Sequence, residues 1–124
     1  MARSGARNEL GQQGEDIALL FLEKKGYVLL ERNFTTKLGE IDLLMRQEEC
    51  IVVVEVKTMA IASTFNPIDK IDWAKQKKLL LLAQVISSRY PEQSIRIDAV
   101  TVYWVSGSKK PVVTHIENSV IPQT

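Results

Sequence analysis

The stretch GEIDLLMRQEECIVVVEVKT, residues 39–58, decides how this sequence is interpreted, because it combines strand-like apolar runs with charged residues. Residues 39–46 and 51–58 are rich in branched apolar side chains and are separated by a short polar link, which is typical of a hairpin. Among the charged residues within the two runs are Glu40, Asp42, Glu55 and Lys57. Burying a charge is unfavourable unless it is paired or binds a metal, so the arrangement of these four residues matters most.

A hairpin with its turn between Glu48 and Glu49 predicts which residues of the two strands face each other. One face is then apolar, with the pairs Met45–Val52, Leu43–Val54 and Ile41–Val56. The other face carries the pairs Arg46–Ile51, Leu44–Val53, Asp42–Glu55 and Glu40–Lys57. All four charges share one end of that face, and a slip of one residue would separate them. The turn lacks the Asn-Gly or Asp-Gly pair that would fix the register.

Directly opposed, Asp42 and Glu55 would have Cβ atoms ~4.5–5.5 Å apart and would repel by roughly 3 kcal/mol at an effective dielectric constant of about 20. A divalent cation between them reverses the sign of this interaction, and Mg²⁺, or Mn²⁺, suits a small set of oxygen ligands. The backbone carbonyl of Val56 is a further candidate ligand, and Glu40 an accessory acid. Lys57 is placed to hold or activate a water molecule. The pattern therefore predicts metal-assisted phosphodiester hydrolysis.

A structural interpretation of the same residues stays open. A Glu-x-Lys pattern is common, and Glu23-Lys24-Lys25 also matches it. Two acids beside a lysine are often a solvated sheet end or a salt bridge. An ordinary ion-pair network of this kind predicts no response of the protein to divalent metal.

Composition limits the class of protein. The 124 residues fit one domain covering residues 1–124, in which residues 1–7 are expected to be mobile. The net charge of +1 means that nucleic-acid binding would need a local basic patch. Cys50 is the only cysteine, which excludes an internal disulfide. There is no apolar secretory signal or membrane-length apolar run, so a reducing cytoplasm is expected.

The remaining pattern predicts an α/β fold. The expected elements are a helix over 8–25 with Gly26 as its stop, a strand over 27–32, a turn-rich connection NFTTKLG, a helix ending near Ser88, and strands over 94–104 and 112–117. Asn66 with Pro67, or Asp72, would cap the second helix. Helical spacing turns Glu15 inward or along the rim of the core. The order αβββαβ with one extra strand indicates a mixed sheet flanked by helices.

A local basic patch is present at KQKK, where Lys75, Lys77 and Lys78 begin the second helix and are candidates for contacting a DNA backbone. A solvated helix face is the alternative. The aromatic residues Trp73, Tyr103 and Trp104 are expected to pack in the core or its rim rather than to stack on bases. His115 has no neighbouring ligand set and is expected to be an incidental strand residue.

The order of motifs resembles a known nuclease superfamily. A helix with Glu15, GEIDLL with Asp42, and VVVEVKT with Glu55 and Lys57 resemble the PD-(D/E)XK, or restriction-endonuclease-like, nucleases. Over residues 11–103, the succession GEDIALLFLEKKGY, RN, GEIDLL, EVKT, K and RIDAV is similar to the YraN-like family of uncharacterised bacterial proteins, related to archaeal Holliday junction resolvases.

This resemblance implies a restriction-endonuclease-like αβββαβ core that binds Mg²⁺ through Asp42 and Glu55, with Lys57 as the catalytic lysine. It implies that Glu15 is an accessory acid that serves a second metal or orients water. By the same resemblance, Lys75 is a phosphate contact and Arg96 with Asp98 forms a supporting ion pair. Met59 and Asn66 depart from the arginine and glycine usual in the family, which puts substrate engagement by the loop near them in doubt.

Two functional hypotheses follow. The first is a Mg²⁺-dependent endonuclease acting on DNA, with branched or structured DNA among the candidate substrates. The second is a non-catalytic nucleic-acid-binding or protein-interaction module that keeps the nuclease fold. Resolvase-like relatives act as dimers, so a homodimer is one expected assembly, although no dimer surface can be identified from the sequence.

Overall fold

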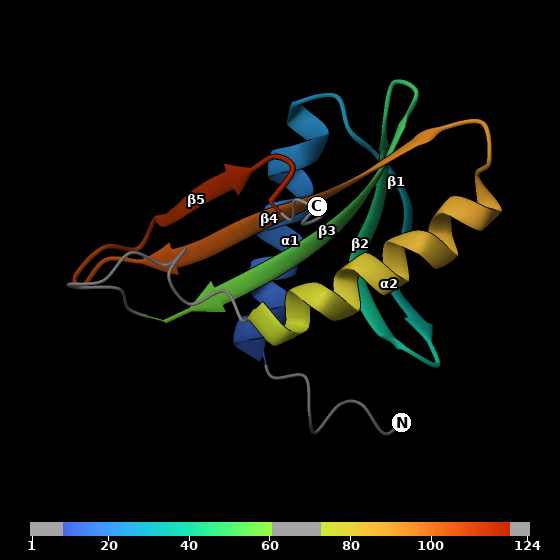
Figure 1. Ribbon diagram of the computed structural model, residues 1–124. Helices are drawn as coiled ribbons and strands as arrows, with labels where there is room; N and C mark the ends of the chain where they lie inside the picture. Colours follow the sequence, from blue (N-terminus) through green and yellow to red (C-terminus); the bar gives the residue numbers. More distant parts are fainter. Residues whose placement is uncertain (1–8, 61–72, 120–124) are drawn as a thin grey trace.

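The computed structural model describes residues 9–60 and 73–119, with the backbone alone described for residues 73–75 (Figure 1). In chain order, the described elements are α1 (Glu9–Lys24), β1 (Val28–Thr36), β2 (Gly39–Gln47), β3 (Cys50–Met59), α2 (Trp73–Arg89), β4 (Ser94–Trp104) and β5 (Pro111–Ile116). The predicted order αβββαβ with one extra strand is confirmed. The expected mobility of residues 1–7 and the caps at Asn66, Pro67 and Asp72 lie outside the described residues.

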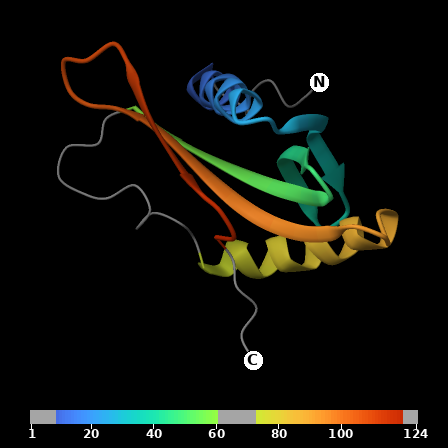
Figure 2. The same ribbon diagram turned by 90° about the horizontal axis from the view of Figure 1, so that it is seen from above.

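The five strands form one mixed sheet in the order β1-β2-β3-β4-β5. Strands β3 and β4 are parallel, and the other neighbouring pairs are antiparallel. Helix α2 lies between β3 and β4 in the chain, as the connection between parallel strands requires. Seen along the sheet, α1 covers one face and α2 covers the other (Figure 2). Neither helix in the described part of the chain is long and apolar enough to cross a membrane.

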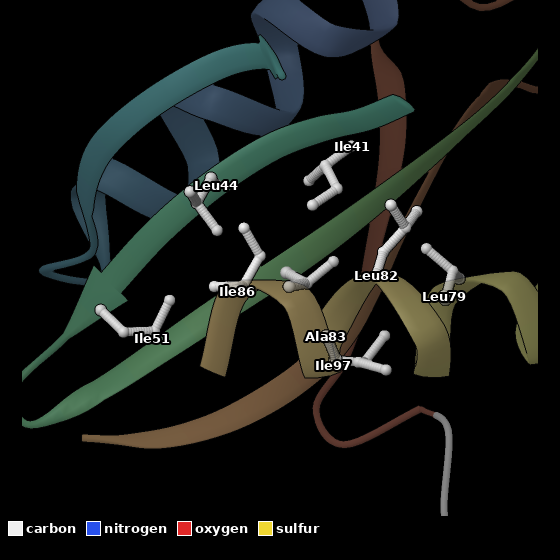
Figure 3. Close-up of a cluster of buried hydrophobic side chains, with 9 residues drawn as sticks. Ile41, Leu44, Ile51, Leu79, Leu82, Ala83, Ile86 and Ile97 are labelled. Carbon is white, nitrogen blue, oxygen red and sulfur yellow. The ribbon is translucent and has the colours of Figure 1, made fainter. Parts of the chain in front are cut away.

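Each face of the sheet carries its own core. The core beneath α1 contains Ala18, Leu22, Tyr27, Leu43, Met45, Val52, Val54, Val100 and Val102. The core beneath α2 contains Ile41, Leu44, Ile51, Val53, Leu79, Leu82, Ala83, Ile86 and Ile97 (Figure 3). Successive residues of a strand point to opposite faces, so the apolar run 51–54 feeds both cores in turn. This explains why β3 is apolar throughout its first half.

Helix α1 is held close to β3 by glycine. A Cβ atom added at Gly14 would lie 1.9 Å from Thr58 Oγ1, so only glycine permits this approach. As predicted, Gly26 stops the helix, and its φ of 95° is in the left-handed region. The Tyr27 N–H donates to the Leu22 carbonyl at 3.1 Å. The close approach brings the turn of α1 that carries Glu15 against the last part of β3.

The hairpin register is confirmed where the two strands pair, from Leu43–Val54 to Gln47–Cys50. The ladder ends at Leu43 and Val54, so the predicted pairs Ile41–Val56, Asp42–Glu55 and Glu40–Lys57 are wrong as ladder pairs. Ile41 also packs in the core beneath α2, whereas Leu43 packs beneath α1, contrary to the prediction of one shared face.

The prediction for residues 33–39 is also wrong. They were expected to form a turn-rich connection, yet β1 continues to Thr36 and pairs with β2 as far as Thr36–Gly39. The polar composition of NFTT suggested a turn, but pairing along β2 and the packing of Phe34 against the α2-side core hold the segment extended. Only residues 37 and 38 remain as the connection.

Candidate functional site

Asp42 lies where β2 and β3 stop pairing. The Val56 N–H donates a hydrogen bond of 2.8 Å to Asp42 Oδ2, so the carboxylate accepts a donor that a continuing ladder would have given to a backbone carbonyl. Hydrogen bonds to a charged acceptor are among the stronger ones. In a strand, the N–H and C=O of one residue point to the same neighbouring strand. The carbonyl of Val56 is therefore directed to the edge that Asp42 occupies.

Glu55 and Lys57 follow on β3, on the face that α2 covers. Val53 belongs to the core beneath α2, and strand alternation places Glu55 and Lys57 on the same side. Glu55 is buried, with 9% of its surface exposed, whereas Lys57 is exposed. Burying a carboxylate requires compensating charge or hydrogen bonds, and Glu55 is buried next to the point where the β2–β3 ladder ends.

Thr101 is a neighbour of this pair that the sequence did not single out. It aligns with Lys57 in the parallel ladder between β3 and β4, and alternation places it on the same face. Thr101 is fully buried, and within the described structure its Oγ1 has no hydrogen-bond partner. Buried hydroxyl groups are nearly always hydrogen-bonded, so Thr101 is an exception. The sequence could not have revealed it, because threonine is an ordinary residue in a strand rich in β-branched side chains.

Glu15 is turned inward from α1 and is buried, with 5% of its surface exposed. The side-chain amide of Asn33 donates to Glu15 Oε1 at 3.1 Å, and Arg32 Nη2 lies 3.6 Å from the same oxygen. Arg32 also pairs with Asp16 at 2.6 Å. Across residues 9–60 and 73–119, no three Asp, Glu, His or Cys side chains are grouped closely enough to bind a metal by themselves. Glu15, Asp42 and Glu55 therefore do not form a three-carboxylate site.

The other predicted residues lie around this region. Glu40 is half-buried on β2 and pairs with Thr35 of β1. Lys77 and Lys78 are exposed on α2, and Lys75 belongs to the first turn of that helix, although its side chain is outside the described residues.

A second polar cluster is centred on Asp98, which is fully buried in β4. Arg96 Nε donates to Asp98 Oδ1 at 2.8 Å, which is the ion pair that the resemblance implied. His115 Nε2 lies 2.8 Å from Asp98 Oδ2, Tyr27 donates its hydroxyl at 3.3 Å, and the Asn118 N–H donates at 3.0 Å. The carboxylate is thus surrounded by donors from several elements.

The expectation that His115 is incidental is wrong. Its side chain is 1% exposed, and Lys25 Nζ lies 2.8 Å from its Nδ1. Because an ammonium group can only donate, Nδ1 accepts and Nε2 carries the proton that is given to Asp98. Lys25 and His115 are far apart in the sequence, and neither they nor Tyr27 carried a pattern that could have revealed this contact.

Burial opposes ionisation of Asp98, but the hydrogen bonds from His115, Arg96 and the Asn118 N–H outweigh it and lower its pKa to about 2. Burial raises the pKa of Tyr27 to about 12, and the negative charge of Asp98 adds to this effect. The hydrogen bond to Asp98 raises the pKa of Arg96. Near neutral pH the cluster therefore holds an ionised Asp98, a charged Arg96 and a neutral Tyr27.

Together, these features define a mixed α/β protein with a five-stranded sheet between two helices and acidic residues where β2 and β3 separate. The chain belongs to uncharacterised protein family UPF0102, the YraN-like family, whose model matches residues 14–102. This range includes the whole candidate site and the Asp98–Arg96 pair, while His115 lies beyond it.

Curated relatives cover most of the chain. A UPF0102 protein of Caldanaerobacter subterraneus subsp. tengcongensis is 41% identical over 99 residues, which span 78% of this chain and 81% of the relative. A UPF0102 protein of Thermodesulfovibrio yellowstonii is 38% identical over 115 residues, or 92% and 97% of the two chains. One from Janthinobacterium is 45% identical over 85 residues, or 68% and 69%. Their names state the family and no activity.

Proposed function

We propose that this protein is a Mg²⁺- or Mn²⁺-dependent endonuclease with a restriction-endonuclease-like core, hydrolysing phosphodiester bonds in DNA, with branched or structured DNA as a candidate substrate. The proposal is carried by one observation: the Asp42 carboxylate is held by the Val56 N–H where the β2–β3 ladder ends, beside buried Glu55. An acid that takes the place of a backbone partner departs from regular sheet pairing, and such departures are expected at functional sites.

The donor chemistry of the site fits a hard divalent cation. Asp42 and Glu55 offer carboxylate oxygens, and the Val56 carbonyl points to the same edge, so all three candidate ligands are oxygen atoms. The lack of a third grouped carboxylate in the described residues suits Mg²⁺, which usually keeps several water molecules. When bound, the metal would polarise the phosphodiester group and favour ionisation of a water molecule.

The remaining roles belong to residues of this chain. Lys57 projects from the same face as Glu55 and is exposed. Its ammonium group can therefore bind a phosphate group or orient a water molecule near the scissile bond. Exposed Lys77 and Lys78 on α2, together with Lys75, would contact the phosphate backbone on either side. Cytoplasmic location and assembly as a homodimer are part of this proposal.

The direct test is cleavage of labelled DNA. The purified protein is incubated with linear duplex, flapped, single-stranded and four-way DNA, and with single-stranded RNA, in Mg²⁺, Mn²⁺ or EDTA. We expect metal-dependent cleavage of at least one DNA substrate, and its loss in Glu55→Gln. Glu49→Gln is the matched control, because it removes one exposed carboxylate from the β2–β3 turn. Cleavage in EDTA, or equal cleavage by both variants, would contradict the proposal.

A non-catalytic nucleic-acid-binding or interaction module is the second candidate. It is favoured by the position of Glu15, which is held by Asn33 and Arg32 and does not complete a three-carboxylate group. This alternative predicts binding to DNA or to another protein with no cleavage of any substrate in the panel.

A further inference from the structure

Strand β1 changes face at Asn33. Residues two apart in a regular strand point to the same side, but Arg32 and Phe34 do not. Arg32 contacts α1, through Asp16 at 2.6 Å and the Gln12 carbonyl at 3.5 Å. Phe34 packs on the opposite face, against the core beneath α2.

Strand β2 changes face at the matching position. Leu43 packs beneath α1 and Ile41 beneath α2, although they too are two residues apart. In the β1–β2 ladder Arg32 pairs with Leu43 and Phe34 pairs with Ile41. Asn33 and Asp42 therefore lie opposite each other at the point where both strands turn over. The β2–β3 ladder ends at Leu43, and the adjacent Asp42 accepts the Val56 N–H instead.

Asn33 has the backbone conformation that such a change of face needs. Its φ is 54°, in the left-handed region that asparagine tolerates far better than branched or bulky residues do. Its side-chain amide donates to Glu15 Oε1 at 3.1 Å. One residue thus connects the local geometry of β1 and β2 to the acid on α1.

We infer that Asn33 is a positioning residue for the proposed active site, which it serves in two ways. Its left-handed backbone turns β1 over and lets Asp42, on the neighbouring strand, leave the ladder and bind the Val56 N–H. Its amide fixes the Glu15 carboxylate beside the same region. This inference deepens the proposed function and rests on it, because positioning of Asp42 and Glu15 matters only if they act on a substrate or its metal.

The backbone role and the amide role can be separated with two variants. Asn33→Gly keeps the left-handed conformation and removes the amide, whereas Asn33→Ala removes the amide and disfavours that conformation. We expect the Val56 amide to keep its protection from hydrogen exchange in Asn33→Gly. In Asn33→Ala, the protection factor of this amide should fall about tenfold. The amide of Val102, in the middle of β4, reports global stability in the same samples and serves as the control.

Cleavage of the best substrate measures the amide role. Asn33→Gly should cleave at least about tenfold more slowly than the wild-type protein, because the Glu15 carboxylate loses the hydrogen bond that the Asn33 amide donates to it. Asn33→Asp tolerates the same backbone but sets a carboxylate against Glu15. It should melt below the wild-type protein at pH 7, because two like charges would then face each other.

The outcomes separate this inference from the proposed function. If the wild-type protein cleaves nothing and does not respond to metal, the proposed function fails and the active-site role of Asn33 fails with it. If the wild-type protein cleaves DNA, but Asn33→Gly cleaves equally well and Val56 exchange is unchanged in Asn33→Ala relative to Val102, the inference alone is overturned. Asn33 would then be a tolerated irregularity of an edge strand.

Discussion

The two acidic centres of this protein are built in opposite ways. Around Asp98, donors from Tyr27, Arg96, His115 and the Asn118 backbone converge on one fully buried carboxylate. Around the end of the β2–β3 ladder, the acids belong to different elements: Asp42 to β2 and Glu55 to β3, with Glu15 of α1 bound to Asn33, the residue opposite Asp42.

The contrast indicates what each centre contributes. A buried acid surrounded by cations and hydrogen-bond donors joins the elements that supply them, which here are β4, β5 and the segment after α1. The acids of the second centre instead lie around the point where regular pairing of β2 and β3 ends, and such departures from regular structure are expected at functional sites. The first centre is therefore expected to control stability, and the second to control activity and the response to metal.

The largest expected effect tests the second centre. Lys57→Ala should reduce metal-dependent DNA cleavage by about 10²-fold or more, the usual contribution of a group that positions or transfers a proton. It should leave the thermal stabilisation by Mn²⁺ in place, because Lys57 is not among the oxygen ligands. Lys24→Ala, an exposed lysine at the end of α1, is the matched control for cleavage. Full activity of Lys57→Ala would remove Lys57 from the mechanism.

The next effect tests the first centre through pH. The pKa of Asp98 is about 2 in the folded protein and about 3.9 in an unfolded chain, so the unfolded state binds more protons between these values. Asp98 therefore stabilises the fold fully above about pH 5, and this contribution, about 2–3 kcal/mol, is lost progressively as the pH falls toward and below 2. Urea unfolding from pH 7 to pH 2 measures the loss.

Asp98→Asn provides the comparison for that titration, because the other carboxylates titrate alike in both proteins. The variant should be less stable at pH 7, since Arg96 and the His115 ring lose their charged acceptor. The gap between the two proteins should then narrow as the pH falls. Parallel curves would show that Asp98 does not hold its charge as the structure indicates.

A smaller effect concerns the helix beside the second centre. Changing Lys75, Lys77 and Lys78 together to Ala should weaken DNA binding and lower the slope of log affinity against log salt by up to about 3, since each lost phosphate contact removes ~0.9. Changing Lys24, Lys109 and Lys110 alters the net charge equally, at the end of α1 and at the β4–β5 turn, away from α2 (Figure 1). Equal slopes for both triple variants would identify the α2 lysines as a solvated face.

The sequence predicted those parts of the fold that follow from local pattern. The long strand over 94–104 is rich in β-branched residues, and its predicted bounds are those of β4. The β2–β3 register was correct over 43–47, because apolar residues must fill two cores at once. Gly26 marked the end of α1 because few other residues adopt its conformation.

The failures of prediction share a physical cause. Strand alternation assumes an unbroken period of two. The left-handed backbone of Asn33 interrupts that period in β1, and β2, which pairs with β1, changes face at the matching position. The Ile41 face and the Asp42–Glu55 pairing were wrong for this reason. The partners of His115 are Lys25, directly after α1, and Asp98 of β4, so only the tertiary fold brings them together.

The smallest expected effect examines the second centre with the metal absent. Asp42→Asn keeps an oxygen that can accept the Val56 N–H and removes one charge beside Glu55. The hydrogen bond weakens because its acceptor is neutral, while the repulsion between the negative charges of Asp42 and Glu55 disappears. We expect the loss of this repulsion to outweigh the weaker hydrogen bond by about 1 kcal/mol after solvent screening, so the metal-free variant should melt slightly higher than the wild-type protein.

Metal should reverse this order. Mg²⁺ or Mn²⁺ at 100 times its Kd would stabilise the wild-type protein by about 2.7 kcal/mol through mass action, and the variant much less because one of its carboxylate ligands is gone. Glu49→Gln, in the exposed β2–β3 turn, should follow the wild-type protein in both conditions. An ordinary ion-pair network makes the opposite prediction, in which Asp42→Asn melts lower without metal and the wild-type protein ignores metal. Thermal melts of the three proteins, with and without millimolar metal, therefore distinguish an acidic site built for a cation from one that only supports the sheet.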